Sequence, residues 1–97
     1  MTVRILSSGK RDLIAGKQFY DQQGREVGNY FFESITEDVD SLEKFGGSHR
    51  RLYGLHRMLA SHFPFGIFYE KRDKEIIVFR ILDLRKNPKN IREALKK

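Results

Sequence analysis

The clearest periodic pattern in this chain runs over residues 26–45, where apolar side chains return every three or four positions. These apolar positions are Phe31, Ile35, Val39 and Leu42. Carboxylates occupy positions between them: Glu33, Glu37, Asp38, Asp40 and Glu43. An α-helix turns once in about 3.6 residues, so the spacing predicts an amphipathic helix with one buried face and one solvated acidic face. Gly46 and Gly47 are expected to end it.

A weaker helical pattern precedes this one. We expect a short strand over residues 2–6, then two capping serines and a helix over residues 9–23. Its expected apolar side consists of Leu13, Ile14, Phe19 and Tyr20. Gly16 lowers the helix propensity, and Gly24 is the expected stop. The two helices should therefore form an antiparallel hairpin joined near Gly24.

Strand patterns follow residue 47. Strands are expected at residues 58–63, 66–71 and 75–82, with a polar turn at residues 72–74. The last strand is nearly continuous in Ile, Val, Phe and Leu, which is typical of a central strand buried on both faces. Pro64 has no amide hydrogen, so we place it at the bend between the first two of these strands.

A terminal helix is expected over residues 90–97, with Pro88 near its first turn. The resulting order is β-α-α-β-β-β-α. It predicts an α+β fold in which the helices lie on one side of a mostly antiparallel sheet, with the hairpin packed on that sheet.

The aromatic stretch HFPFGIFYE at residues 62–70 permits two interpretations, a ligand-binding aromatic box or a core strand. Strand alternation defines two faces: Phe65, Ile67 and Tyr69 on one, Gly66, Phe68 and Glu70 on the other. Core packing accounts for most of these aromatics, so no small-molecule ligand is expected.

Composition narrows the class of protein. The 97 residues fit a single domain over residues 1–97, and 39% of them are hydrophobic. No apolar run approaches the roughly 18 residues of a membrane span, and no signal peptide is recognisable. The absence of cysteine excludes disulfides and thiolate metal sites. A cytoplasmic protein without a membrane partner is the expectation.

Positive charge is concentrated in the second half of the chain. Residues 1–47 carry 6 Lys/Arg and 8 Asp/Glu, whereas residues 48–97 carry 13 and 5. The cations beside the expected strands are Arg50, Arg51, Arg57, Arg80, Arg85, Lys86 and Lys89. Guanidinium groups match the oxygens of phosphates and carboxylates, so these residues predict a polyanion or an acidic protein partner. A merely solvated basic surface is the alternative.

Motifs for metal, phosphate-loop or serine-hydrolase chemistry are missing from the sequence. His49, His56 and His62 are not arranged in a HExxH-type spacing, so no metal is expected. The Gly46–Gly47 pair lacks the spacing of a phosphate loop, and no G-x-S-x-G elbow occurs. We therefore expect no cofactor.

Two long motifs carry a resemblance over nearly the whole chain. The first motif is RDLIAGKQFYDQQG, and the second is HRMLASHFPFGIFYEKRDKEIIVFRILDLRKNP. The second motif contains an arginine-led strand, an F-P-aromatic element, a polar turn, an apolar strand and a late proline. In this order and spacing the chain resembles the RelE/ParE superfamily of toxins from type II toxin–antitoxin systems. The matching positions are Arg57, Phe63, Pro64, Phe65, Ile67, Tyr69 and Pro88.

The resemblance implies a small toxin that a cognate antitoxin neutralises. RelE-type members are ribosome-dependent endoribonucleases that cut mRNA, whereas ParE-type members poison DNA gyrase. Several positions depart from the nuclease pattern. Gly66 stands where relatives often carry arginine, Asp83 replaces a usual histidine, Lys86 replaces an arginine, and Arg92 lies near the usual late tyrosine.

The resemblance leaves Arg57 and Lys86 as the cationic candidates for catalysis at matching places. Phosphate or target binding would involve Arg50, Arg51, Arg57, Arg85 and Lys86, and His62 is the nearest candidate base. RNA cleavage by 2′-hydroxyl attack needs a base, an acid and phosphate stabilisation. Because the sequence departs from the nuclease pattern at several of the expected positions, a ParE-like action on a protein such as gyrase is favoured. The alternatives are a ribosome-dependent mRNA endoribonuclease and a non-toxic orphan that only binds a partner.

Overall fold

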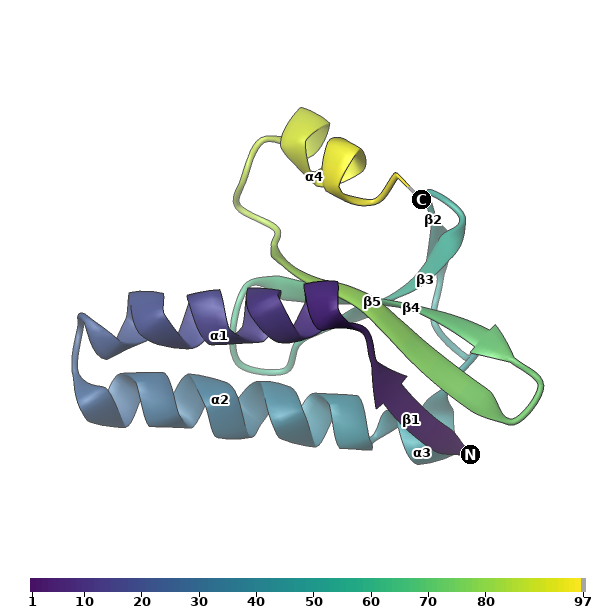
Figure 1. The fold of residues 1–97 in the computed structure, drawn as a ribbon, viewed down its shortest axis with the longest axis horizontal. Helices are drawn as coiled ribbons and strands as arrows, with labels where there is room; N and C mark the ends of the chain where they lie inside the picture. The colour runs from purple at the N-terminus through teal and green to yellow at the C-terminus, as the bar shows by residue number, and fades with distance from the viewer. Residues whose placement is uncertain (97) are drawn as a thin grey trace.

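A computed structural model describes residues 1–96 and contains one five-stranded sheet with helices on both faces (Figure 1). The elements follow in the order β1 (Thr2–Ile5), α1 (Ser7–Asp21), α2 (Arg25–Asp40), α3 (Leu42–Phe45), β2 (Arg51–Leu52), β3 (Leu55–Leu59), β4 (Phe65–Arg72), β5 (Glu75–Asp83) and α4 (Pro88–Ala94). The strand order is β1-β5-β4-β3-β2, with β1 parallel to β5 and the other pairs antiparallel. The predicted α+β class is confirmed, and β2 and α3 are additional short elements.

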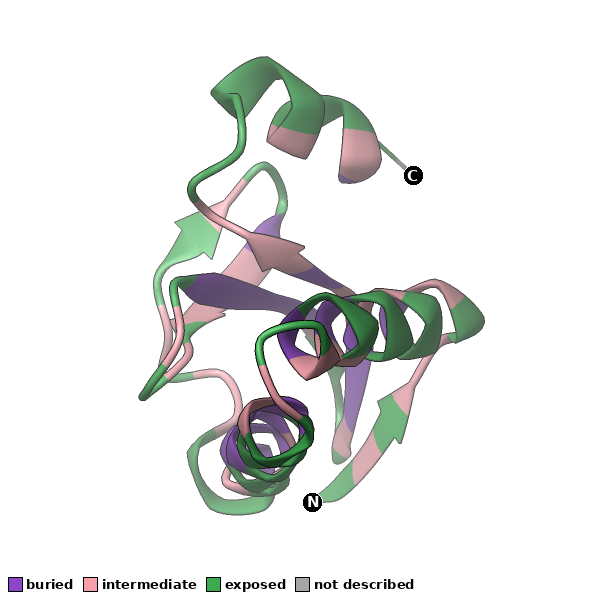
Figure 2. Ribbon diagram, turned by 90° about the vertical axis from the view of Figure 1, so that its left-hand side faces the viewer, coloured by how far each residue is buried: buried purple, intermediate pink, exposed green. Residues whose placement is uncertain are grey.

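The two faces of the sheet bury separate apolar clusters. The α1–α2 hairpin packs on the face that carries Phe65, Ile67 and Tyr69, whereas α4 packs on the face that carries Phe68. Figure 2 shows α4 on one side of the sheet and the hairpin on the other. The prediction that all helices lie on one side was wrong for α4, because the second face is also apolar and Leu95 helps to cover it.

Helix α2 is shorter than its sequence pattern predicted. Its predicted core positions are all buried: Phe31, Ile35, Val39 and Leu42. The helix nevertheless ends at Asp40, and α3 forms a separate turn. At the break, the hydroxyl of Ser41 donates to the carbonyl of Asp38 at 2.6 Å. Such a local side-chain bond offers the backbone an alternative to continuing the helix.

The buried face of α1 differs from the predicted one. Its buried positions are Gly9, Leu13, Gly16 and Tyr20. Ile14 and Phe19, which were expected in the core, are 54% and 50% exposed. A Cβ on Gly16 would lie 2.6 Å from Cζ of Phe31, so glycine allows α1 and α2 to approach closely. The apolar pattern missed this face because two of its contact positions are glycines.

The strand predicted over residues 58–63 lies earlier, because β3 spans Leu55–Leu59. It follows β2 through a two-residue turn, Tyr53–Gly54, whose φ angles of 55° and 83° suit a tight hairpin. Pro64 lies in the connection between β3 and β4, as predicted. Its carbonyl accepts from the amide of Leu84 at 2.8 Å. The strands predicted over residues 66–71 and 75–82 are confirmed with small extensions.

A one-residue bulge in β5 determines the position of Arg80. Tyr69 pairs with Val78, but Phe68 pairs with Arg80, so Phe79 is the extra residue of β5. Strict alternation would place Arg80 on the same face as Val78, within the hairpin core. The bulge shifts Arg80 to the α4 face instead, where it lies opposite Phe68 and is half buried.

The last helix, α4, begins at Pro88, two residues earlier than predicted, and ends at Ala94. The side chain of Asn87 caps it by accepting from the amide of Lys89 at 2.9 Å. The final residue of the predicted helix, Lys97, lies outside the described residues. Across residues 1–96, none of the helices has the length and apolar character needed to span a membrane.

Candidate functional site

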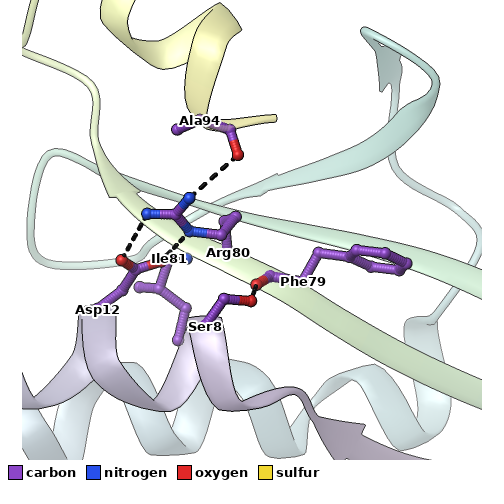
Figure 3. Close-up of polar contacts among 6 residues, drawn as sticks. All are labelled: Ser8, Asp12, Phe79, Arg80, Ile81 and Ala94. Carbon is purple, nitrogen blue, oxygen red and sulfur yellow. Dashed lines mark hydrogen bonds and ion pairs between the residues drawn. The ribbon is translucent and has the colours of Figure 1, made fainter. Parts of the chain in front are cut away.

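Helix α1 covers the part of β5 that β1 leaves unpaired. The parallel pairing between β1 and β5 stops at Val78. Beyond it, the Ser8 hydroxyl donates to the carbonyl of Phe79 at 2.7 Å, and Asp12 accepts from the amide of Ile81 at 2.9 Å (Figure 3). Side chains of α1 thereby satisfy backbone groups that would otherwise form an open sheet edge.

Arg80 connects β5 to both α1 and α4. Its Nε and Nη2 donate to the two oxygens of Asp12 at 2.7 and 2.9 Å, and its Nη1 donates to the carbonyl of Ala94 at 3.0 Å (Figure 3). The bidentate hydrogen bond that Arg80 donates to Asp12 raises the pKa of Arg80. All three guanidinium nitrogens are engaged within the chain, so this predicted surface cation is a structural residue.

Beside this junction, residues of α1, β4 and β5 line a groove of about 330 Å³ together with Lys86. Its apolar lining includes Phe19, Phe65 and Leu82, and its charged rim includes Lys86. The volume is at the lower end of the range for ligand pockets, about 300–1,000 Å³. Apolar residues with a charged rim suit side chains of an amphipathic partner segment.

Arg85 lies near this groove but is paired with a carboxylate. Its Nη2 and Nε donate to Asp83 at 2.8 and 3.0 Å, and Nη2 also lies 3.3 Å from the hydroxyl of Tyr20. The bond from Arg85 lowers the pKa of Asp83, and the same ion pair raises the pKa of Arg85. A phosphate would have to compete with Asp83 for Arg85. Lys86 has no ion-pair partner within residues 1–96.

Three other predicted cations lie on or beside β2 and β3, the last two strands of the sheet order. Arg50 directly precedes β2, Arg51 lies in β2, and Arg57 lies in β3. Arg51 donates to the carbonyl of Gly54 at 3.1 Å, and none of the three arginines forms an ion pair within residues 1–96.

The strand order therefore divides the predicted cations into two groups. The edge arginines lie on and beside β3, whereas Arg85 and Lys86 follow β5, two strands away. Arg57 and Arg80 share a cross-strand row with Phe68 between them, but Asp12 neutralises Arg80. Lys89, in the first turn of α4, is exposed. The arrangement presents two separate basic regions.

His62, the candidate base, lies in the exposed connection before β4 and packs beside Tyr30, with 5.8 Å between ring centroids. No described contact joins it to a cationic candidate. The adjacent Ser61 donates its amide and hydroxyl to Asp38 at 2.9 and 2.6 Å. Asp38 was expected on the solvated face of α2, but it is buried because it holds this connection.

A polar cluster that the sequence patterns did not predict surrounds the buried Tyr69. Its hydroxyl accepts from the amide of Gly47 at 2.9 Å and lies 2.5 Å from Nδ1 of His49. His56 stacks on the same ring at 5.1 Å between centroids. Burial and the nearby His56 lower the pKa of His49, and burial raises the pKa of Tyr69. The cluster holds the connection between α3 and β2.

The aromatic stretch of residues 62–70 is a core element. Phe65, Phe68 and Tyr69 are all buried, which supports the core-strand interpretation. A Cβ on Gly66 would lie 3.0 Å from Phe68 and 3.1 Å from Leu84. The position at which relatives often carry arginine is therefore tightly packed, and a longer side chain would require its neighbours to move.

The sheet order, the helical hairpin and the terminal helix together define the α+β fold of this chain. A chain of the solved structure "Chromosomal ParDE TA system from P. aeruginosa" shares it, with a TM-score of 0.78 and 21% identity over 87% of this chain and 96% of that chain. No family model and no curated protein matches the sequence. At this identity the likeness establishes the fold.

Proposed function

We propose that this protein is the toxin of a type II toxin–antitoxin system, acts in the cytoplasm and is neutralised by a cognate antitoxin. The observation that carries the proposal is the likeness to a chain of a ParDE system, which extends over 96% of that chain. The motif order of the sequence supports the same assignment independently. We further propose a ParE-like action, in which the toxin inhibits a protein such as DNA gyrase.

The arrangement of the candidate catalytic residues supports a protein target over RNA cleavage. Arg57 lies on β3, Lys86 follows β5, and His62 packs beside Tyr30, so the described contacts join no base to a phosphate-binding group. Cleavage through a 2′-hydroxyl needs these groups around one phosphate. A toxin that acts by binding needs only a complementary surface.

Induced expression with and without the candidate antitoxin tests the general proposal. We expect growth arrest that co-expression of the antitoxin relieves. Harmless expression, with gyrase activity and mRNA both intact, would instead indicate a non-toxic orphan.

A second assay tests the ParE-like action. If the proposal holds, the purified protein should inhibit supercoiling by gyrase. Normal supercoiling at saturating protein would refute the ParE-like action while leaving the toxin assignment open to the alternative below.

The alternative is a ribosome-dependent mRNA endoribonuclease, favoured by the unpaired cations Arg57 and Lys86. Primer extension on mRNA after induction would then show cuts phased with codons. Arg57→Gln and Lys86→Gln should both reduce that cleavage if both side chains contact phosphate. Arg11→Gln, an exposed change on α1, is the matched control and should leave cleavage unchanged.

A further inference from the structure

The solvent-facing side of α2 carries a shallow apolar hollow between two carboxylates. Phe32, Glu33, Thr36 and Glu37 line this α2 hollow, which has a volume of about 200 Å³. Thr36 donates its hydroxyl to the carbonyl of Phe32 at 2.7 Å, and neither glutamate forms an ion pair within residues 1–96. Residues 26–43 contain 6 Asp/Glu and no Lys or Arg. A group that fits the α2 hollow would therefore combine an apolar side chain with positive charge.

The turn between β2 and β3 presents a group of this kind. Tyr53 is 43% exposed at the turn, and the guanidinium group of Arg92 in α4 lies 5.6 Å from the centroid of its ring. Arg51 in β2 donates to the carbonyl of Gly54 at 3.1 Å, which holds its charge beside the same turn. Neither arginine forms an ion pair within residues 1–96, and residues 44–69 contain no Asp or Glu. Arg51, Tyr53 and Arg92 together form the hairpin tip, an exposed ring accompanied by two cations.

The conformation of the turn does not require a tyrosine at residue 53. The φ angle of Tyr53 is 55°, in the left-handed region that Gly, Asn and Asp adopt more readily than bulky side chains. Asn-Gly is a preferred pair for a two-residue hairpin turn, whereas this chain has Tyr-Gly. Burial does not account for the tyrosine either, because the contact with Arg92 leaves it well exposed. The ring is therefore available to a partner.

The α2 hollow and the hairpin tip lie on opposite sides of the molecule. In Figure 1, α2 runs along the bottom, whereas α4 and β2 lie toward the top, and Figure 2 shows the same separation of α2 from α4. The two surfaces therefore cannot meet within one chain, but they can meet between two copies. Every copy presents both surfaces, so a second copy is a complementary partner that is present at the protein's own concentration.

We propose that copies of this chain associate head to tail, with the hairpin tip of one copy in the α2 hollow of the next. Tyr53 would contact Phe32, and the two arginines of the tip would lie near Glu33 and Glu37. Aromatic and arginine side chains are common anchors of protein–protein contacts. Because tip and hollow are different surfaces, the contact is heterologous and extends beyond a dimer. A contact of this size is weak, and its exposed charges make it depend on salt.

Sedimentation velocity of the purified, nuclease-treated full chain tests the association. At about 0.1 M salt, the average sedimentation coefficient should rise with protein concentration past the value of a dimer. At about 1 M salt the chain should sediment as a monomer, because the screening length falls from about 10 Å to about 3 Å. A chain that stays monomeric at about 0.1 M salt and about 1 mM protein, or that stops at a dimer, would refute the proposal. Association that nuclease treatment abolishes would overturn it in favour of a nucleic-acid partner.

Two variants locate the contact. Tyr53→Asn removes the ring and places a residue at this position that suits the turn, so the fold should persist. Glu37→Lys reverses one charge of the α2 hollow. Each variant should weaken self-association by at least about tenfold. Glu26→Lys is the matched control: it makes the same charge change roughly 16 Å earlier along α2 and should associate like the native chain.

An equimolar mixture of the two variants separates head-to-tail association from other modes. Tyr53→Asn keeps the hollow and Glu37→Lys keeps the tip, so the mixture should form a dimer and nothing larger. A mixture that stays monomeric would refute the contact between tip and hollow, and so would native-like association of either variant alone. If circular dichroism shows that Tyr53→Asn fails to fold, Arg51→Glu replaces it in the mixture. None of these outcomes depends on the growth assay or on inhibition of gyrase.

Discussion

Asp12 is the side chain on which the junction of α1, β5 and α4 depends most. The substitution Asp12→Ala removes two hydrogen bonds from Arg80 and one from the amide of Ile81. It leaves a guanidinium group that is 28% exposed and a backbone amide without its acceptor. Arg80 would retain only its bond to the carbonyl of Ala94.

The expected cost follows from the partial burial of the pair. Exposed ion pairs contribute about 0.2–1 kcal/mol, whereas breaking a buried pair costs about 3–5 kcal/mol. Side chains that are 28% and 15% exposed place Arg80 and Asp12 between these limits. Loss of the acceptor for Ile81 adds about 1 kcal/mol. We therefore expect Asp12→Ala to lower the free energy of unfolding by about 2–4 kcal/mol.

Urea unfolding followed by far-ultraviolet circular dichroism measures this loss. Asp12→Asn should cost less, because its amide oxygen can still accept from Ile81. Glu93→Ala is the control: its pair with Lys96 is well exposed, so its loss should change the free energy of unfolding by less than about 0.5 kcal/mol. An unchanged urea midpoint for Asp12→Ala would refute a stabilising role of the Arg80–Asp12 pair. Equal losses of unfolding free energy for Asp12→Ala and Asp12→Asn would refute the contribution of the bond to the amide of Ile81.

Three further outcomes follow from packing and protonation. Gly16→Ala should lower the melting temperature, because the added Cβ would lie 2.6 Å from Phe31. Such overpacking costs about 1–3 kcal/mol, whereas the higher helix propensity of alanine returns about 1 kcal/mol. Leu95→Ala should lower the free energy of unfolding by about 2 kcal/mol, because this side chain is buried under α4. The pKa of His49 is lower in the folded protein than its ordinary value of 6.5, so the unfolded chain binds a proton at this histidine more readily than the folded chain does. Acidification from about pH 7 to about pH 5 should therefore lower the free energy of unfolding. His49→Gln, which can keep a bond to Tyr69, should weaken that pH dependence.

Matched controls separate these effects from general damage. Gln18→Ala, at an exposed position of α1, should leave the melting temperature nearly unchanged. Ile14→Ala removes a half-exposed side chain and should cost less than Leu95→Ala. A loss for Gly16→Ala no larger than that for Gln18→Ala would contradict close packing against Phe31. A stability of His49→Gln that falls as steeply with acid as that of the native chain would contradict the assignment to His49.

Elements with a clear hydrophobic periodicity were predictable from the sequence. Features that tertiary contacts determine were not. The core positions of α2 followed from helical spacing alone. The buried face of α1 did not, because Gly9 and Gly16 are buried through the closeness of their neighbours. The bulge at Phe79 was equally hidden, since a run of apolar residues has no alternation that could reveal an extra residue.

The candidate site was predictable as a set of residue types but not as an arrangement. The cations Arg57 and Arg80 were recognisable, yet only the register of three strands shows that they share a row. The neutralisation of Arg80 depends on Asp12, which is 68 residues earlier in the chain. The cluster around Tyr69 likewise requires His49 and His56 to meet across a hairpin. The spacing of residues within one sequence does not reveal these contacts between distant segments.

The bonds of Arg80 also join three segments that are far apart in the chain. Asp12 in α1 precedes Arg80 by 68 residues, and Ala94 in α4 follows it by 14 residues. All the strands of the described residues lie between β1 and the end of β5 at Asp83, so α4 adds no strand to the sheet. Its contribution is to cover one face of a sheet whose strands all precede it in the chain.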